Sequence, residues 1–66
     1  MKITLNGEIR QFPAPLTVAQ LVDTLGYTGK RIAIERNGEI VPRSRHGDVL
    51  LAENDCLELV VAVGGG

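Results

Sequence analysis

The dipeptide Asn-Gly occurs twice in this chain of 66 residues, each time between short runs that contain alternating apolar side chains. Asn-Gly is the preferred pair for a two-residue type I′ turn, because both central positions of that turn need a positive φ. Asn6-Gly7 and Asn37-Gly38 therefore predict two β-hairpins, one at the start of the chain and one past its middle. The strands expected on either side of these turns are 1–6, 8–12, 32–36 and 39–41.

The second of these strands departs from strict alternation. Ile9 and Phe12 lie three residues apart, whereas side chains on one face of a strand lie two apart. Either a bulge intervenes, or Phe12 has already left the strand to pack beneath the next element.

One helix is predicted between the hairpins. Thr17 and Gln20 have the spacing of a capping box, in which each side chain binds the backbone N–H of the other residue. Gly26 is suited to the left-handed conformation that ends many helices. Between them, apolar side chains recur at a spacing that aligns them along one helix face: Val18, Leu21, Val22 and Leu25.

The last predicted strand, 56–63, is the longest and the richest in β-branched residues. Its apolar character favours a central position, parallel to the first strand. The polar segment 43–48 is expected to be a surface connection, and 49–51 a short apolar turn against the core. One helix across one face of a mixed sheet of four to five strands would bury both apolar surfaces. The order of elements thus predicts an α+β fold, the β-grasp or ubiquitin-like fold.

Size, charge and cysteine content exclude several classes of protein. A chain this short holds one modest core, so we expect a single domain over 1–63. Seven Lys and Arg against eight Asp and Glu lack the basic excess of a nucleic-acid binder. One cysteine and one histidine provide neither an internal disulfide nor a four-ligand zinc site, so no metal is expected. The longest apolar run has five residues, against about twenty for a membrane helix. With no signal peptide recognisable at the start, we expect a cytoplasmic protein without a membrane partner.

Three glycines, Gly64, Gly65 and Gly66, follow the last predicted strand. We expect 64–66 to form a flexible tail that reaches roughly 10 Å beyond the domain. Without Cβ atoms, such a tail fits a channel too narrow for other residues and can present its terminal carboxylate to a nucleotide. Adenylation would turn that carboxylate into an electrophile for a sulfur or nitrogen nucleophile. A frayed linker is the other interpretation of a glycine run, but the position directly after the final strand favours the chemical role.

From end to end the chain resembles the ThiS family, the small sulfur carrier proteins of bacterial thiamine biosynthesis. Four segments carry the resemblance: Leu5-Asn6-Gly7-Glu8, Thr17-Val18-Ala19-Gln20-Leu21-Val22, Glu35-Arg36-Asn37-Gly38-Glu39-Ile40-Val41-Pro42-Arg43 and Val61-Ala62-Val63-Gly64-Gly65-Gly66. Gly65 and Gly66 supply the terminal Gly-Gly that the family requires.

This resemblance implies a carrier that is not an enzyme and binds no cofactor itself. It implies that a ThiF-like enzyme adenylates Gly66 with Mg-ATP, and that a cysteine-desulfurase relay supplies the sulfur for a thiocarboxylate. It further implies that a ThiG-like thiazole synthase receives the sulfur.

Partner contacts are expected on the outward face of the last strand. Val60 and Ala62 alternate with the core positions, and one helix cannot cover both faces of a sheet, so both side chains should be exposed beside the tail. They predict a small apolar docking patch. Arg43, in a short basic stretch with Arg45 and His46, is a further candidate that would pair with acidic groups of a partner and speed their encounter.

Two other residues are candidates for catalysis, and two other functions are alternatives to this interpretation. No nucleophile or orienting carboxylate is evident beside His46, and no neighbouring charge in the sequence activates the thiol of Cys56. A molybdopterin-synthase small subunit-like carrier shares the Gly-Gly chemistry and is the nearest alternative function. A β-grasp nucleotide- or RNA-binding module is the other, and it is disfavoured by the near-neutral charge and the two aromatic residues, which offer little phosphate attraction or base stacking.

Overall fold

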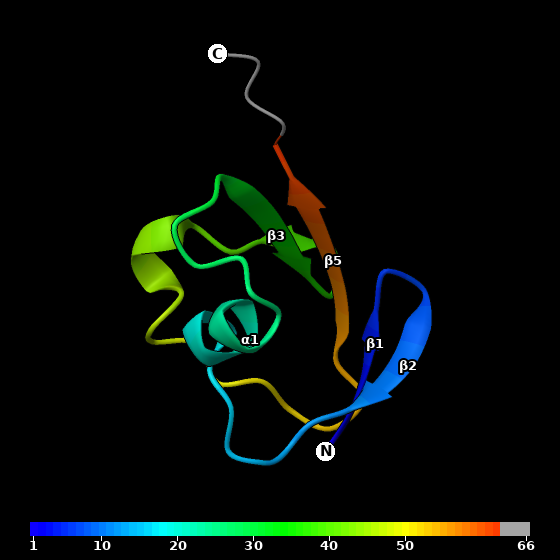
Figure 1. The fold of residues 1–66 in the computed structure, drawn as a ribbon. Coiled ribbons are helices and arrows are strands. Elements are labelled where there is room, and N and C mark those ends of the chain that lie inside the picture. Colours follow the sequence, from blue (N-terminus) through cyan, green and yellow to red (C-terminus); the bar gives the residue numbers. More distant parts are fainter. Residues whose placement is uncertain (63–66) are drawn as a thin grey trace.

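Within residues 1–62, the part of the chain that the computed structural model describes, five strands form one mixed sheet with helix α1 across one face (Figure 1). The strands are β1 (Lys2–Leu5), β2 (Glu8–Gln11), β3 (Ile32–Arg36), β4 (Glu39–Ile40) and β5 (Cys56–Val61). Their order across the sheet is β2-β1-β5-β3-β4. The helix α1 spans Val18–Thr24, and a short 3-10 helix, η1, spans Arg43–Arg45.

Both predicted hairpins are present, and both turn at the expected pairs. Asn6 and Gly7 have φ of 50° and 82°, and Asn37 and Gly38 have φ of 52° and 87°. All four angles lie in the positive region that a type I′ turn requires. β1 pairs with β2, and β3 with β4, in antiparallel register.

No bulge interrupts β2, and Phe12 directly follows its last residue with its backbone still bonded to Met1. β2 ends at Gln11, and the ring of Phe12 is buried in the core. The Phe12 N–H still donates to the Met1 carbonyl at 2.9 Å, so the backbone leaves the sheet only beyond this residue. Ile9 is exposed, and the whole of β2 lies at the edge of the sheet.

The helix begins and ends as its sequence predicts. The Gln20 N–H donates to Thr17 Oγ1 at 3.1 Å, and the Thr17 N–H donates to Gln20 Oε1 at 2.8 Å, which completes the capping box. At the other end Gly26 has a φ of 81°. The Gly26 N–H donates to the Asp23 carbonyl, and the Tyr27 N–H donates to the Val22 carbonyl, both at 3.0 Å. These two bonds form a Schellman motif, which satisfies the last carbonyls of the helix.

β5 occupies the centre of the sheet, as the sequence predicts. It runs parallel to β1 on one side and antiparallel to β3 on the other. Its side chains Leu57 and Leu59 are buried. They pack in a core built from the inner face of the sheet, α1 and four flanking positions: Ile3, Leu5, Phe12, Leu16, Val18, Leu21, Val22, Ile34, Val41, Leu51, Leu57 and Leu59. The parallel pairing of first and last strands with one covering helix is the β-grasp fold, so the predicted fold class is confirmed.

The segment after the second hairpin differs in two ways from the surface connection and apolar turn predicted there. His46 is buried, with only 9% of its surface exposed. Its carbonyl accepts from the Ala19 N–H of α1, which draws this part of the connection onto the helix. In the following turn Leu51 is in the core and Val49 packs partly buried against it, as predicted, while Leu50 is exposed and its backbone bridges to Thr17.

Candidate functional site: the end of the central strand

Two asparagine side chains, one from each hairpin turn, hold the central strand β5. The Leu59 N–H donates to Asn6 Oδ1 at 2.8 Å, and Asn6 Nδ2 donates to the Leu59 carbonyl at 3.1 Å. In the same manner the Cys56 N–H donates to Asn37 Oδ1 at 2.9 Å. The asparagines therefore do more than turn the chain. Their side-chain amides bond the backbone of β5 at positions where β1 and β3 have ended and no longer supply backbone partners.

Asp55 anchors the beginning of β5. Its Oδ2 accepts from Arg36 Nε and from the Ala52 N–H, each at 2.8 Å, and its Oδ1 accepts from Asn37 Nδ2 at 3.0 Å. Burial raises the pKa of Asp55, but these three hydrogen bonds and the charge of Arg36 outweigh that effect and hold the pKa below its ordinary value. The start of the strand is thus fixed by an ionised carboxylate.

The other end of β5 leads to the glycines. β5 ends at Val61, and the next residue, Ala62, donates its N–H to the Arg31 carbonyl at 2.8 Å. The predicted tail residues Gly64, Gly65 and Gly66, and the proposed boundary between 1–63 and 64–66, lie outside the described residues.

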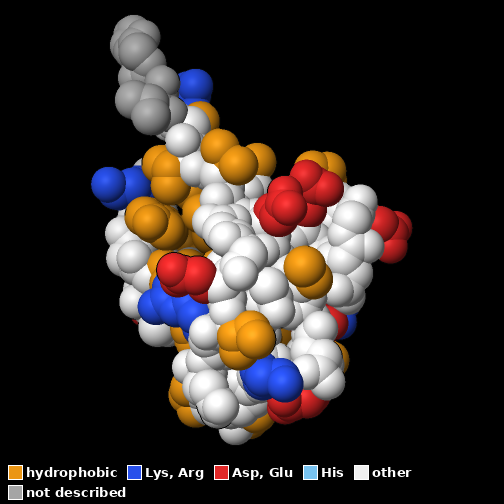
Figure 2. All heavy atoms as spheres, turned by 90° about the vertical axis from the view of Figure 1, so that its right-hand side faces the viewer, with side chains coloured by type: hydrophobic (Ala, Val, Ile, Leu, Met, Phe, Trp, Pro, Cys, Tyr) orange, Lys and Arg blue, Asp and Glu red, His pale blue; other side chains and the backbone are white. Residues whose placement is uncertain are grey.

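An apolar area lies on the outer face of the sheet, defined here as the face opposite α1. Val60 is 63% exposed there, and Ala62 is exposed as well, as the sequence predicts. Ala33 of β3 lies directly opposite Val60, so the area spans two strands. The view from the right-hand side of Figure 1 has hydrophobic side chains gathered towards the upper end of the molecule (Figure 2). The docking role of Val60 and Ala62 stays a prediction.

A pair of acidic side chains lies next to this apolar area. Glu35 of β3 and Glu58 of β5 are direct partners in the register. Because Glu58 alternates with the buried Leu57 and Leu59, its side chain is on the outer face. Like charges directly opposite one another destabilise a sheet, so this pair gives the face a negative character without strengthening the fold.

The sequence alone did not identify Ala33, Ile40 or the acidic pair as part of this face. Ile40 is 65% exposed and lies opposite Glu35. The available signal was the register: once Asn37-Gly38 is taken as a two-residue turn, Glu35 must face Ile40. The register of β3 with β5 could not be derived by counting residues from a turn, because no short turn joins these strands.

Arg43 is not brought together with Val60 and Ala62. It lies in η1, and the chain immediately after η1 bonds to α1, on the helix side of the sheet. In Figure 1 this yellow-green segment lies on the same side of the sheet as α1. Arg31 is a basic residue that the structure does bring to the strand end, through the bond from the Ala62 N–H to its carbonyl.

His46 and Cys56 also lie away from the strand end. The ring of His46 is buried with its Nε2 at 3.2 Å from the Val41 carbonyl. Cys56 is exposed, but it begins β5, opposite Thr4 of β1.

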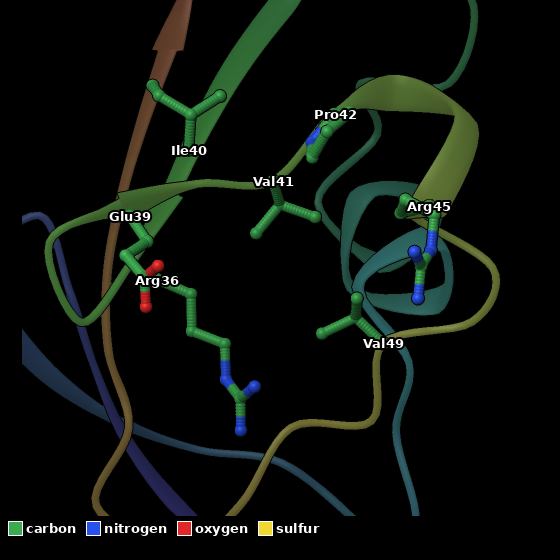
Figure 3. A pocket seen from close by; sticks show the side chains of 7 residues that line it. All are labelled: Arg36, Glu39, Ile40, Val41, Pro42, Arg45 and Val49. Carbon is green, nitrogen blue, oxygen red and sulfur yellow. The ribbon is translucent and has the colours of Figure 1, made fainter.

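A shallow pocket of about 260 Å³ lies between the second hairpin and η1 (Figure 3). Arg36 and Arg45 are the basic side chains in its lining. Arg36 is bound to Asp55 and Arg45 is 3.6 Å from Asp48, so both guanidinium groups already have acidic partners. Among residues 1–62 no cluster of three potential metal ligands is found.

No helix in the described part of the chain is long and apolar enough to span a membrane.

The fold and the position of the last strand define a small protein of the ubiquitin-like β-grasp class. The chain belongs to the ThiS family, whose model matches residues 3–66. It is 36% identical to the sulfur carrier protein ThiS of Bacillus subtilis, over 97% of this chain and 98% of that protein. A crystal structure of the thiamine biosynthesis protein ThiS from Geobacter metallireducens matches with a TM-score of 0.84 at 26% identity, over 100% of both chains.

A further similarity is to part of a larger protein. Over its whole length the chain is 46% identical to a thiazole synthase of Paramagnetospirillum magneticum, of which it spans 20%. The chain thus spans about a fifth of the length of the curated thiazole synthases it matches.

Proposed function

We propose that this chain is a sulfur carrier of thiamine biosynthesis that works through the carboxylate of Gly66. A ThiF-like enzyme transfers AMP from Mg-ATP to that carboxylate, with release of pyrophosphate. A persulfide sulfur supplied by a cysteine-desulfurase relay then attacks the acyl carbon, and AMP leaves. A thiol of the relay cleaves the acyl disulfide so formed, which releases the thiocarboxylate and leaves a disulfide on the relay. The resulting thiocarboxylate donates its sulfur to a ThiG-like thiazole synthase.

In this proposal the chain is a substrate whose folded domain is bound by the partner enzymes, and it is not itself an enzyme. The observation that carries it is the family match through residue 66, on a fold whose central strand leads directly into the glycines. The name of the Bacillus relative supports the carrier role, and the similarity to part of a thiazole synthase supports the proposed recipient. The proposal requires a free α-carboxylate at Gly66.

Intact-protein mass spectrometry tests the chemical step. The carrier is incubated with a ThiF-like enzyme, Mg-ATP and a sulfur source, and we expect a mass gain of about 16 Da from exchange of oxygen for sulfur at the acyl group. A variant lacking Gly65 and Gly66 should gain nothing. An unchanged mass with partners that load another carrier under the same conditions would contradict the proposal.

The outer face is the proposed docking surface for these partners. Val60→Asp places a charge in the apolar area, and we expect weaker binding to the adenylating enzyme with little change in folding, because the side chain is 63% exposed. Leu50→Asp is the matched control, since Leu50 is 58% exposed but lies beside the start of α1. Equal affinities of the two variants would remove the outer face from the proposal.

A further inference from the structure

β5 continues beyond its neighbour β1. Direct pairing of the two strands covers Thr4 with Cys56 and Leu5 with Leu57. The amide of Asn6 then binds Leu59, and the chain turns away into β2. Figure 1 displays this arrangement, with β5 extending past the turn between β1 and β2.

On its other side β5 stays paired to its end. The register with β3 runs as far as Val61, opposite Ile32. Ala62 N–H donates to Arg31 O, so the backbone groups of residue 62 face β3. Because these groups alternate along a strand, the N–H and C=O of Val61 face the opposite edge. Among the described residues no strand lies along that edge beyond Asn6, which leaves it open.

A pocket of about 240 Å³ adjoins this open edge on the helix side of the sheet. Leu25, Leu59 and the ring of Tyr27 contribute apolar surface, and polar groups supply the larger part of the lining. Charged side chains of β2 complete the lining. The full set is Leu5, Asn6, Glu8, Arg10, Leu25, Tyr27 and Leu59. A strand added along β5 would alternate its side chains between the two sheet faces, and those on the helix side would point towards this pocket.

We propose that the open edge of β5 receives an extended segment of the enzyme that adenylates the carrier, by addition of a β-strand. The segment exchanges backbone hydrogen bonds with Val61 and places an amphipathic side chain in the adjoining pocket, with its apolar part against Leu25 and its polar end towards the charged side chains of β2. This inference rests on the proposed function and specifies how the partner holds the carrier.

The position of the edge argues for this occupant. Val61 precedes Gly64 by three residues in the sequence, so a protein that binds the glycines along their length comes within roughly 10 Å of Val61. The other two edges of the sheet lack this continuity. β2 carries alternating charges at Glu8 and Arg10 on its helix-side face, and β4 has only two residues. Charged and very short edges are features that oppose strand addition.

Replacing a single amide by an ester tests the proposed hydrogen bond. Cys56 allows ligation of a synthetic segment 56–66 to a thioester of 1–55, with the hydroxy acid analogue of Val61 in the synthetic part. The ester retains the side chain, removes the Val61 N–H and weakens the Val60 carbonyl as an acceptor towards β3. We expect the affinity for a purified ThiF-like enzyme, measured by calorimetry, to fall about tenfold, with the melting temperature lowered less than by the control ester described next.

The matched control is the ester at Glu58. Its N–H faces β3 by the same alternation as that of Ala62, so this ester should lower the melting temperature and leave the affinity of the folded protein unchanged. If the Val61 ester binds as tightly as the parent while both are adenylated, the inference is wrong and the proposed function stands. If the parent is not adenylated by an enzyme that acts on another carrier, the proposed function fails, and the inference fails with it.

Amide exchange in the unmodified carrier gives an independent measurement. The Val61 N–H should exchange at least about tenfold more slowly in the complex than in the free protein. Unchanged exchange of Val61 in a saturated complex overturns strand addition, and loss of binding in Val60→Asp alone would then assign recognition to the outer face.

Discussion

Replacing Asp55 by asparagine should destabilise the fold at neutral pH, because the carboxylate accepts hydrogen bonds from three donors. Arg36 Nε and the Ala52 N–H share Oδ2, and Asn37 Nδ2 binds Oδ1. An asparagine at position 55 has one acceptor oxygen, so its NH₂ group must face a donor. Asn37 cannot relieve this by rotating its amide, because its Oδ1 already accepts from the Cys56 N–H at 2.9 Å.

The magnitude follows from this count of hydrogen bonds. Losing the bond to Asn37 outright costs about 1.5–3 kcal/mol, the contribution typical of a bond to a charged group. Loss of the negative charge at the other two bonds adds roughly 1 kcal/mol, because Arg36 is about one-third exposed and its ion pair is partly screened. A total of about 3 kcal/mol in the free energy of unfolding lowers the melting temperature of so small a domain by roughly 12–24 °C.

Thermal unfolding followed by circular dichroism between pH 7 and pH 2 measures this effect. The pKa of Asp55 lies below its ordinary value in the folded protein. Its contribution to stability is therefore complete above the unfolded-state pKa of about 4 and is lost as the pH falls through the folded-state pKa. The melting temperatures of the parent and of Asp55→Asn should converge below about pH 4. Equal melting temperatures at pH 7, or a difference that stays constant down to pH 2, would refute the reasoning.

Three further substitutions test separate parts of the structure. Asn6→Gly keeps the positive φ but loses both bonds to β5, which should cost about 1–2 kcal/mol in urea unfolding; Asn54→Gly, at another positive φ of 69°, should be close to neutral. Gly26→Ala should cost about 1–2 kcal/mol because its φ is 81°, whereas Gly47→Ala, which also meets no atom within 4 Å, should not; equal effects would contradict the helix-end geometry. Cys56→Ser should leave sulfur loading intact by mass spectrometry, and loss of loading in a folded variant would give the thiol a role that its position does not suggest.

Local structure was predictable wherever one short segment contains all the atoms that decide it. The capping box of Thr17 and Gln20 and the left-handed Gly26 involve neighbours a few residues apart, and each is present as predicted. The segment after the second hairpin was less predictable. His46 is polar and sits among polar residues, yet it is buried because its carbonyl and ring nitrogen find partners on α1 and at Val41.

For the candidate site, the sequence predicted which side chains of the last strand are exposed, but not which residues of other strands lie beside them. The exposure of Val60 follows from its position between Leu59 and Val61 in a strand with one covered face. Its neighbour Ala33 follows only from the pairing of β3 with β5. The glycines themselves were identified from the sequence, and their proposed chemistry is a matter for experiment.

By itself the sequence determined the two turns, the helix limits and the alternation of the first and last strands, because backbone conformation and side-chain period are set by residues close together in the chain. Tertiary structure decided which strands are neighbours, and so where hydrogen-bonding groups are left over. The sequence marks Asn6 as a turn residue, but only the fold places its amide against Leu59, 53 residues away. The open edge at Val61 is a consequence of the same contact, since it exists only where β1 stops and β5 continues.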